Sequence, residues 1–185
     1  MTKKFKFTAE NKRKADAEIS KYPDGRQKSA VMGLLDIAQR QNHNWLSQES
    51  MDYVAEYLGM APIRVYEIAT FYTMYNLKPV GKFLFQVCGT TPCALRGAED
   101  IISTCKEAMG VDLEGSSEDG NFTLKEVECL GACANAPVIQ INDDYYEDLT
   151  VERVQQIIET LRQGRKIKAG SQTNRQSSEP INKQG

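Results

Sequence analysis

The sequence predicts an α+β fold, in which an N-terminal helical bundle is followed by a small β-sheet flanked by helices. Two observations lead to this prediction. Between residues 8 and 78, apolar residues recur at helical spacing between short breaks. From Lys82 onward, short runs of β-branched and aromatic residues alternate with amphipathic helical stretches. The segment Pro79-Val80-Gly81 separates the two patterns and marks the predicted domain boundary.

The N-terminal region begins with three predicted helices. A short one ends before Pro23-Asp24-Gly25, and a second spans 29–41 with apolar residues at positions i, i+3, i+4 and i+7. Ser47 is a suitable N-cap for a third helix, which runs to about Leu58. Gly59 then stands where a helix commonly ends in the left-handed conformation.

A fourth helix is predicted over 63–75, with Pro62 at its start. Its residues are apolar nearly all round the helix, and a helix of this kind is buried. The sequence leaves two ways to bury it open. The helix either packs within its own fold or is covered by a partner subunit.

The C-terminal region has the element order β-α-β-β-β-α, which is thioredoxin-like in style. The predicted strands are 83–87, 123–128, 138–141 and 145–147, and the predicted helices are 94–109 and 151–161. From Gly164 onward, small and polar residues dominate, and this composition predicts disorder. The predicted domains are therefore a helical bundle over 1–80, a thioredoxin-like domain over 81–165 and a disordered tail over 166–185.

The composition is typical of a globular protein, with 185 residues, 41% hydrophobic and 26% charged. The net charge of −2 is unevenly spread, because residues 29–165 carry −10 while 1–28 carry +5 and 166–185 carry +3. An acidic body argues against nucleic acid as the partner, since phosphate binding needs a basic face. No apolar stretch approaches the ~20 residues that span a bilayer, and the N-terminus lacks the apolar core of a signal peptide. We therefore expect neither a membrane span nor secretion.

Four of the five cysteines form two pairs. Cys88 and Cys93 enclose four residues, Cys129 and Cys133 enclose three, and 35 residues lie between the pairs. Each pair occupies a short loop that contains glycine or proline and follows a predicted strand. In a chain without a secretory signal, grouped cysteines indicate metal or redox chemistry more often than disulfides.

The residues around these cysteines suit negatively charged thiolates. Thr91 and Pro92 favour the start of a helix at Cys93, where backbone N–H groups and the helix dipole stabilise an anion. Gly131 permits a tight turn in the second loop, and its small neighbours let backbone N–H groups approach sulfur. Arg96, one turn along the first helix, either adds to this effect or faces solvent.

Spacing alone leaves three interpretations of the four thiols open. A [2Fe-2S] cluster takes two cysteines per iron, which matches two pairs from two loops. Zinc usually takes C-x2-4-C pairs, often with histidine, but the only histidine, His43, lies far away in the sequence. A disulfide or buried free thiols is the third interpretation. The fifth cysteine, Cys105, lies mid-helix near Ile101 and Ile102 and is expected to be a buried apolar residue.

At these residues the chain resembles the 24-kDa (E) subunits of respiratory complex I, the proton-pumping NADH:quinone oxidoreductase. The matching segments are VCGTTPCALRG (87–97), ECLGACANAP (128–137), VYEIATFY (65–72), IND (141–143) and the F-x-F of Phe5 and Phe7. The resemblance covers about residues 5–165. No ligand position departs from the family's pattern.

The resemblance implies an N-terminal helical bundle followed by a thioredoxin-like α/β ferredoxin domain, in which Cys88, Cys93, Cys129 and Cys133 hold one [2Fe-2S] cluster. It also implies an electron-transfer subunit that docks on a larger flavin subunit, which binds FMN and NADH, and through it on the peripheral arm of the complex. The cluster would exchange single electrons with the FMN, off the main chain of clusters that leads to quinone.

Two further expectations concern activity and location. The isolated chain should carry electrons without oxidising NADH, because it has no Gly-rich dinucleotide loop. The resemblance implies a peripheral subunit on the cytoplasmic side of the bacterial inner membrane, or on the matrix side of the mitochondrial inner membrane.

Three rival functions compete with this one. Ala55, Gly59 and Val65 have the spacing of a helix-turn-helix, but the predicted helix over 63–75 holds Arg64 as its only basic residue, which is too few for DNA contacts. A free ferredoxin, or the equivalent subunit of an NAD-linked hydrogenase or formate dehydrogenase, fits the cysteines equally well. The N-terminal bundle favours an obligate partner over a free ferredoxin. A zinc-stabilised adaptor without a redox role would be recognised by metal analysis.

Overall fold

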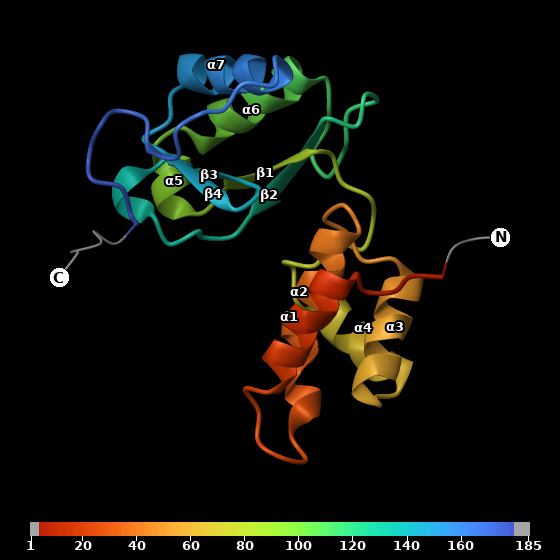
Figure 1. Cartoon of the computed structure of the whole chain (residues 1–185). Coiled ribbons are helices and arrows are strands. Elements are labelled where there is room, and N and C mark those ends of the chain that lie inside the picture. Colours follow the sequence, from red (N-terminus) through yellow and green to blue (C-terminus); the bar gives the residue numbers. More distant parts are fainter. Residues whose placement is uncertain (1–3, 180–185) are drawn as a thin grey trace. The chain divides into compact units, whose positions relative to one another are not determined.

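The structure, a computed structural model, describes residues 4–179 (Figure 1). The chain divides between Val80 and Gly81 into two compact units, here called the helical unit and the sheet unit. Each unit has its own core of buried apolar residues. None of the helices in these residues is long and apolar enough to cross a membrane.

The helical unit consists of α1 (Ala9–Ile19), the 3-10 turn η1 (Gln27–Ala30), α2 (Val31–Gln41), α3 (Gln48–Leu58) and α4 (Pro62–Phe71). The predicted ends of α3 are confirmed. The Ser47 hydroxyl oxygen accepts a hydrogen bond from the Ser50 N–H at 3.2 Å, and Gly59 has a φ of 60°. The apolar stripes of α2 and α3 bury Leu34 and Val54 completely, so these two helices form the centre of the unit.

The fourth helix differs from its prediction in both length and burial. It ends at Phe71 because Tyr72 has an extended backbone, which turns the chain so that Tyr75 enters the core and donates a hydrogen bond to the Met32 carbonyl at 2.9 Å. The expectation of burial all round is wrong within this unit. The large apolar side chains that stay exposed, here called the α4 apolar surface, are Ile63, Phe71, Tyr72, Met74 and Leu77.

The sheet unit is built on strands in the order β2-β1-β3-β4-β5, which confirms the α+β class. Their bounds are β1 (Phe83–Cys88), β2 (Phe122–Val127), β3 (Ile139–Ile141), β4 (Asp144–Glu147) and β5 (Gly170–Ser171). β1 pairs with β2 in parallel and with β3 antiparallel, while β4 pairs antiparallel with β3 and parallel with β5. The β3–β4 hairpin turns at Asn142, which has a φ of 55°.

The helix predicted over 94–109 is in fact two helices, α5 (Thr91–Leu95) and α6 (Ala98–Met109). Gly97 separates them with a φ of 93°, a left-handed conformation that glycine adopts without steric cost. Thr90 occupies the N-cap position of α5, so Thr91 is the first residue of the helix, and the Thr90 side chain makes no capping hydrogen bond.

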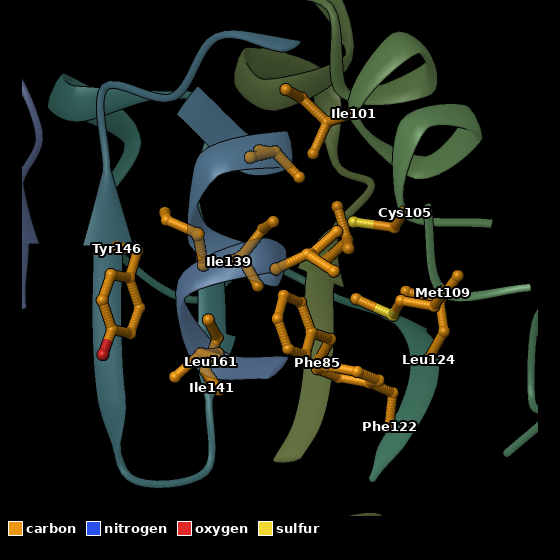
Figure 2. Packing of buried hydrophobic residues seen from close by; sticks show 14 of the residues in the cluster. Phe85, Ile101, Cys105, Met109, Phe122, Leu124, Ile139, Ile141, Tyr146 and Leu161 are labelled. Atoms are coloured by element: carbon orange, nitrogen blue, oxygen red, sulfur yellow. The ribbon is translucent and has the colours of Figure 1, made fainter. Parts of the chain in front are cut away.

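The core of the sheet unit lies between the sheet and two helices, α6 and α7 (Val151–Arg162). These helices lie side by side over one face of the sheet (Figure 1). Figure 2 shows their apolar side chains packed around Phe85 of β1 and Ile139 of β3. Each large apolar side chain buried in this way contributes roughly 1.5–3 kcal/mol. This packing fixes the end of β1, where Cys88 stands.

The segment after α7 is arranged differently from what its composition suggests. The sequence predicts disorder over 166–185, but in the described part, 166–179, β5 pairs with β4 through Tyr146 and Gly170. Polar side chains of this segment hydrogen-bond to groups of the sheet unit, which composition alone does not indicate. The rest of the predicted tail, 180–185, lies outside the described residues.

Candidate metal centre

The first cysteine pair lies where β1 passes into α5. Cys88 is the last residue of β1, and its N–H donates to the Val138 carbonyl at 3.1 Å. The next residue, Gly89, donates to Val127 of β2 at 3.0 Å, so the sheet holds the backbone on both sides. Cys93 lies in α5, and both cysteines are 2% exposed. The first pair is therefore buried on a rigid support.

The second pair lies in the loop that leaves β2. Cys133 begins the 3-10 turn η2 (Cys133–Asn135), and both Cys129 and Cys133 are exposed. Their sulfur atoms are 3.5 Å apart. Gly131 has a φ of 81°, and this conformation places its N–H 3.4 Å from the Cys129 sulfur. The tight turn expected at this glycine thus brings a donor to a thiol.

The two cysteine pairs lie near each other in the sheet unit. The Thr90 hydroxyl lies 3.3 Å from the Cys88 sulfur and also lowers the pKa of Cys129, so it acts on a thiol of each pair. The buried first pair packs in one apolar cluster with small residues of the second loop. Cys133 is near enough to Cys93 to act on it electrostatically.

Burial and hydrogen bonds shift the pKa values of the two thiols of the first pair in opposite directions. Burial would raise the pKa of the Cys88 thiol, but hydrogen bonds from the Thr90 hydroxyl and from the backbone N–H groups of Leu130 and Thr90 together lower it. Burial, followed by the hydrogen bond to Cys88, raises the pKa of Cys93 to about 12. Cys88 is therefore the more acidic thiol of the first pair.

The pKa values of the two thiols of the second pair also shift in opposite directions. The Gly131 N–H lowers the pKa of Cys129, with smaller contributions from the Cys133 thiol and Thr90. The hydrogen bond to Cys129 raises the pKa of Cys133. Each pair thus combines a more acidic thiol with a less acidic one. A metal centre that displaces the thiol protons would gain two thiolate ligands from each pair.

This donor set fits a thiolate-bound iron–sulfur cluster. A [2Fe-2S] cluster takes two cysteines on each iron, and hydrogen bonds to the sulfurs stabilise its negative charge. Within residues 4–179, no three Cys, His, Asp or Glu side chains are grouped so that they could hold a single metal ion. The four thiols come as two pairs from two loops, which matches two cysteines on each iron.

The remaining sequence candidates take no part in this centre. Cys105 is fully buried in the core, as predicted, and burial raises the pKa of its thiol to about 12. Arg96 caps the end of α5 and is exposed, which agrees with the solvent-facing alternative. Sequence reasoning missed Thr90 and the backbone N–H groups of Leu130 and Val138 as donors to sulfur. A hydroxyl residue two positions after a ligand cysteine is the one signal that could have identified the first.

Comparisons with known proteins agree with this geometry. The family model of the thioredoxin-like [2Fe-2S] ferredoxins matches residues 15–162. The chain is 56% identical over 158 residues to the E subunit of NADH-quinone oxidoreductase from Rickettsia bellii (strain RML369-C), covering 85% of this chain and 95% of that one. It is 47% identical over 175 residues to the mitochondrial NADH dehydrogenase [ubiquinone] flavoprotein 2 of Dictyostelium discoideum, covering 95% of this chain and 71% of that one.

A solved structure shares the fold at low identity. The air-oxidised NAD+-reducing [NiFe]-hydrogenase matches with a TM-score of 0.63 and 17% identity. The match covers 71% of this chain but 23% of the hydrogenase chain. At this identity the likeness concerns the fold alone.

Proposed function

The chain belongs to the family of thioredoxin-like [2Fe-2S] ferredoxins, and from this premise we propose that its cluster exchanges single electrons with the FMN of a partner flavin subunit. The resemblance to the E subunits of complex I is confirmed, so the chain is an electron-transfer subunit of an NADH-quinone oxidoreductase with one [2Fe-2S] cluster. One observation carries the proposal. A buried thiol pair and an exposed thiol pair lie near each other, and hydrogen-bond donors lie close to their sulfurs.

We assign Cys88 and Cys93 to one iron, and Cys129 and Cys133 to the other. When bound, the cluster accepts and returns one electron at a time. The residues of this chain fix the four sulfurs, donate hydrogen bonds to them and keep water from the first pair. Because the second pair is exposed, we expect the electron donor to approach the loop that holds it. Leu95, 82% exposed in α5, supplies an apolar contact on the side of the first pair.

The metal content and spectrum of the full chain test the ligand set. We expect two irons and two acid-labile sulfides per chain, and an electron paramagnetic resonance signal after anaerobic reduction with dithionite. Replacing any one of the four ligand cysteines by serine should weaken the colour and alter the signal. Cys105→Ser is the matched control and should keep both. One zinc per chain, or an unchanged signal in any one of the four variants, would contradict the assignment.

The α4 apolar surface supports docking on the flavin subunit and, through it, on the peripheral arm of the complex. It gathers five large exposed apolar residues within one short stretch of chain, and such patches mark protein–protein contacts. The Phe71 and Tyr72 rings, 5.0 Å apart, present a compact aromatic contact. Aromatic residues of this kind commonly dominate binding at interfaces.

Co-purification of the chain with its flavin subunit tests this contact. The double variant Phe71→Glu, Met74→Glu should lose the complex, because it places two charges in the apolar contact. Leu113→Glu is the matched control, since Leu113 is also an exposed apolar residue but lies in the sheet unit. Equal recovery of the flavin subunit with both variants would rule out the surface as the docking site.

We further propose that the chain is a peripheral subunit on the cytoplasmic side of a bacterial inner membrane, with the mitochondrial matrix side as the alternative. Relatives of both kinds support a place in a respiratory complex. Protease treatment of sealed vesicles of known orientation tests the side. Cleavage of the chain only in inside-out vesicles is expected, and cleavage only in right-side-out vesicles would contradict the proposal.

A further inference from the structure

Residues 170–179, here called the strap, lie beside the second cysteine loop. They follow the part of the chain that matches the family model, residues 15–162. The strap begins with β5, which pairs with β4, and the Gln172 N–H donates to the Glu147 carbonyl at 2.9 Å. Arg153 of α7 donates two hydrogen bonds, of 2.8 and 2.9 Å, to the side-chain oxygen of Gln172 and so connects the strap to α7 as well.

The strap supplies hydrogen bonds to a buried carboxyl group. Glu147 is 1% exposed. Its two oxygens accept hydrogen bonds from the Ser178 N–H at 3.0 and 3.2 Å, and from the Ser178 hydroxyl. A further donor is the side-chain amide of Asn135, whose nitrogen lies 2.7 Å from a Glu147 carboxylate oxygen. A buried carboxyl group that loses such donors is strongly destabilised.

Asn135 carries this network to the cysteine loop. It is the last residue of η2, the turn that begins at Cys133, and it is 4% exposed. Its side-chain amide donates to both Glu147 and the Gln176 carbonyl at 2.7 Å. Its own carbonyl accepts the Asp148 N–H at 2.7 Å, so the turn is held on three sides.

A second contact reaches the same turn. Arg175 forms an ion pair with Asp148 at 2.7 Å, and the Asp148 side chain is 7% exposed. The same guanidinium lies 3.4 Å from the carbonyl oxygen of Ala134, the residue after Cys133. The strap therefore contacts the ligand loop directly as well as through Asn135.

We propose that the strap positions the second cysteine loop and thereby slows loss of the cluster. The inference rests on the proposed ligand role of Cys133. None of the strap residues holds iron in this scheme. They act through Asn135 and Glu147, and through the contact of Arg175 with Ala134, and so fix the geometry of a proposed metal ligand. The strap also explains why Glu147 can be buried beside the site.

The test compares four forms of the full chain, purified anaerobically with the cluster. One ends at Ala169 and lacks the strap, one ends at Glu179 and keeps it, one carries Ser178→Pro, and one is unchanged. Ser178→Pro removes both donors to Glu147 at an exposed position, so it tests the network even if the shortened chain does not fold. The readouts are the decay of visible absorption with a ferrous chelator, the electron paramagnetic resonance of the reduced form, and thermal unfolding.

We expect cluster loss about tenfold faster in the chain that ends at Ala169, in line with the loss of outer-shell partners. Ser178→Pro should give a smaller increase, with a changed resonance spectrum, and the chain that ends at Glu179 should match the unchanged protein. Equal decay rates and spectra in all forms would overturn the proposal, as would a fall in unfolding temperature alone. If Cys133 is not a ligand, Cys133→Ser will leave the electron paramagnetic resonance signal unchanged, and this result distinguishes a wrong ligand set from a wrong role of the strap.

Discussion

Thr90 is the side chain that joins the two cysteine pairs. Its hydroxyl lies 3.3 Å from the Cys88 sulfur and also lowers the pKa of Cys129. Its backbone N–H is a further donor to Cys88. One residue thus acts on a sulfur of each proposed iron, and hydrogen bonds to sulfur are among the factors that set the potential of such clusters.

Thr90→Val should lower the reduction potential of the cluster. The reduced cluster carries one more negative charge, so hydrogen bonds to its sulfurs stabilise the reduced form more than the oxidised one. The loss of about 0.5–1.5 kcal/mol of hydrogen bonding corresponds to roughly 20–60 mV for one electron. A redox titration followed by electron paramagnetic resonance measures the shift. Thr91→Val, at the exposed neighbouring position, should leave the potential unchanged.

Gly131→Ala should speed cluster loss. Gly131 has a φ of 81°, where an alanine side chain costs roughly 1–2 kcal/mol, and relief of this strain would move its N–H away from Cys129. Gly120→Ala is the matched control, because Gly120 has a φ of 70° and equally open surroundings. Both variants should unfold at lower temperature, but only the first should lose its visible absorption faster. The same rate of loss in both would show that the Gly131 donor is unimportant.

At the residue scale, the sequence could identify the thiols but not the groups around them. Paired cysteines after strands are visible as spacing, and their ligand role remains a prediction. The contact between Asn135 and Glu147 joins residues that become neighbours only when β4 returns past the loop. Backbone donors such as the Leu130 N–H depend on local conformation, and the residue type at that position does not indicate them.

At the scale of elements, prediction succeeded where capping and periodicity agreed. Ser47 and Gly59 bracket α3 as expected, because a side-chain cap and a left-handed glycine are local signals. The division of the helix over 94–109 was missed because the apolar pattern continues across Gly97 and masks the break at that residue. β5 was missed because its two residues, Gly170 and Ser171, have no apolar pattern at all.

The packing of α6 leads to a prediction for Cys105→Ser. The Cys105 side chain is fully buried among apolar residues, where a serine hydroxyl would lack hydrogen-bond partners other than the helix backbone. We expect a loss of about 1–3 kcal/mol in the free energy of unfolding. Urea titration followed by circular dichroism measures it. Iron content should stay at the wild-type level, and loss of iron in proportion to folded protein would mean that Cys105 takes part in the centre.

For the whole molecule, the two units have separate cores and can be followed separately. The only tryptophan of the chain, Trp45, lies between α2 and α3 of the helical unit. Its fluorescence reports on that unit, whereas visible absorption of the cluster reports on the sheet unit. Changes in the stability of one unit can therefore be measured without confusion with the other.

Because the two units can be followed separately, the stability of the helical unit at alkaline pH can test whether its tyrosines are buried. Burial raises the pKa of Tyr75 from 10.0 to about 12, since a phenolate in the core would lose its hydration. Burial, with the hydrogen bond to Asp16, raises the pKa of Tyr57 to about 12 as well. A raised pKa means that the folded state holds the proton more tightly than the unfolded state. The resulting stability is complete below pH 10 and is lost as the pH rises from 10 to 12.

We therefore expect the free energy of unfolding, measured by Trp45 fluorescence in urea, to fall steeply between pH 10 and 12. Each tyrosine contributes at most about 1.4 kcal/mol per pH unit in this window. Tyr75→Phe should cost about 1 kcal/mol below pH 9, because the hydrogen bond to Met32 is lost. Above pH 10 its curve should be shallower than that of the unchanged chain, with Tyr57 supplying the remaining slope. Parallel curves for the two proteins would mean that Tyr75 ionises as easily in the folded unit as in the unfolded chain.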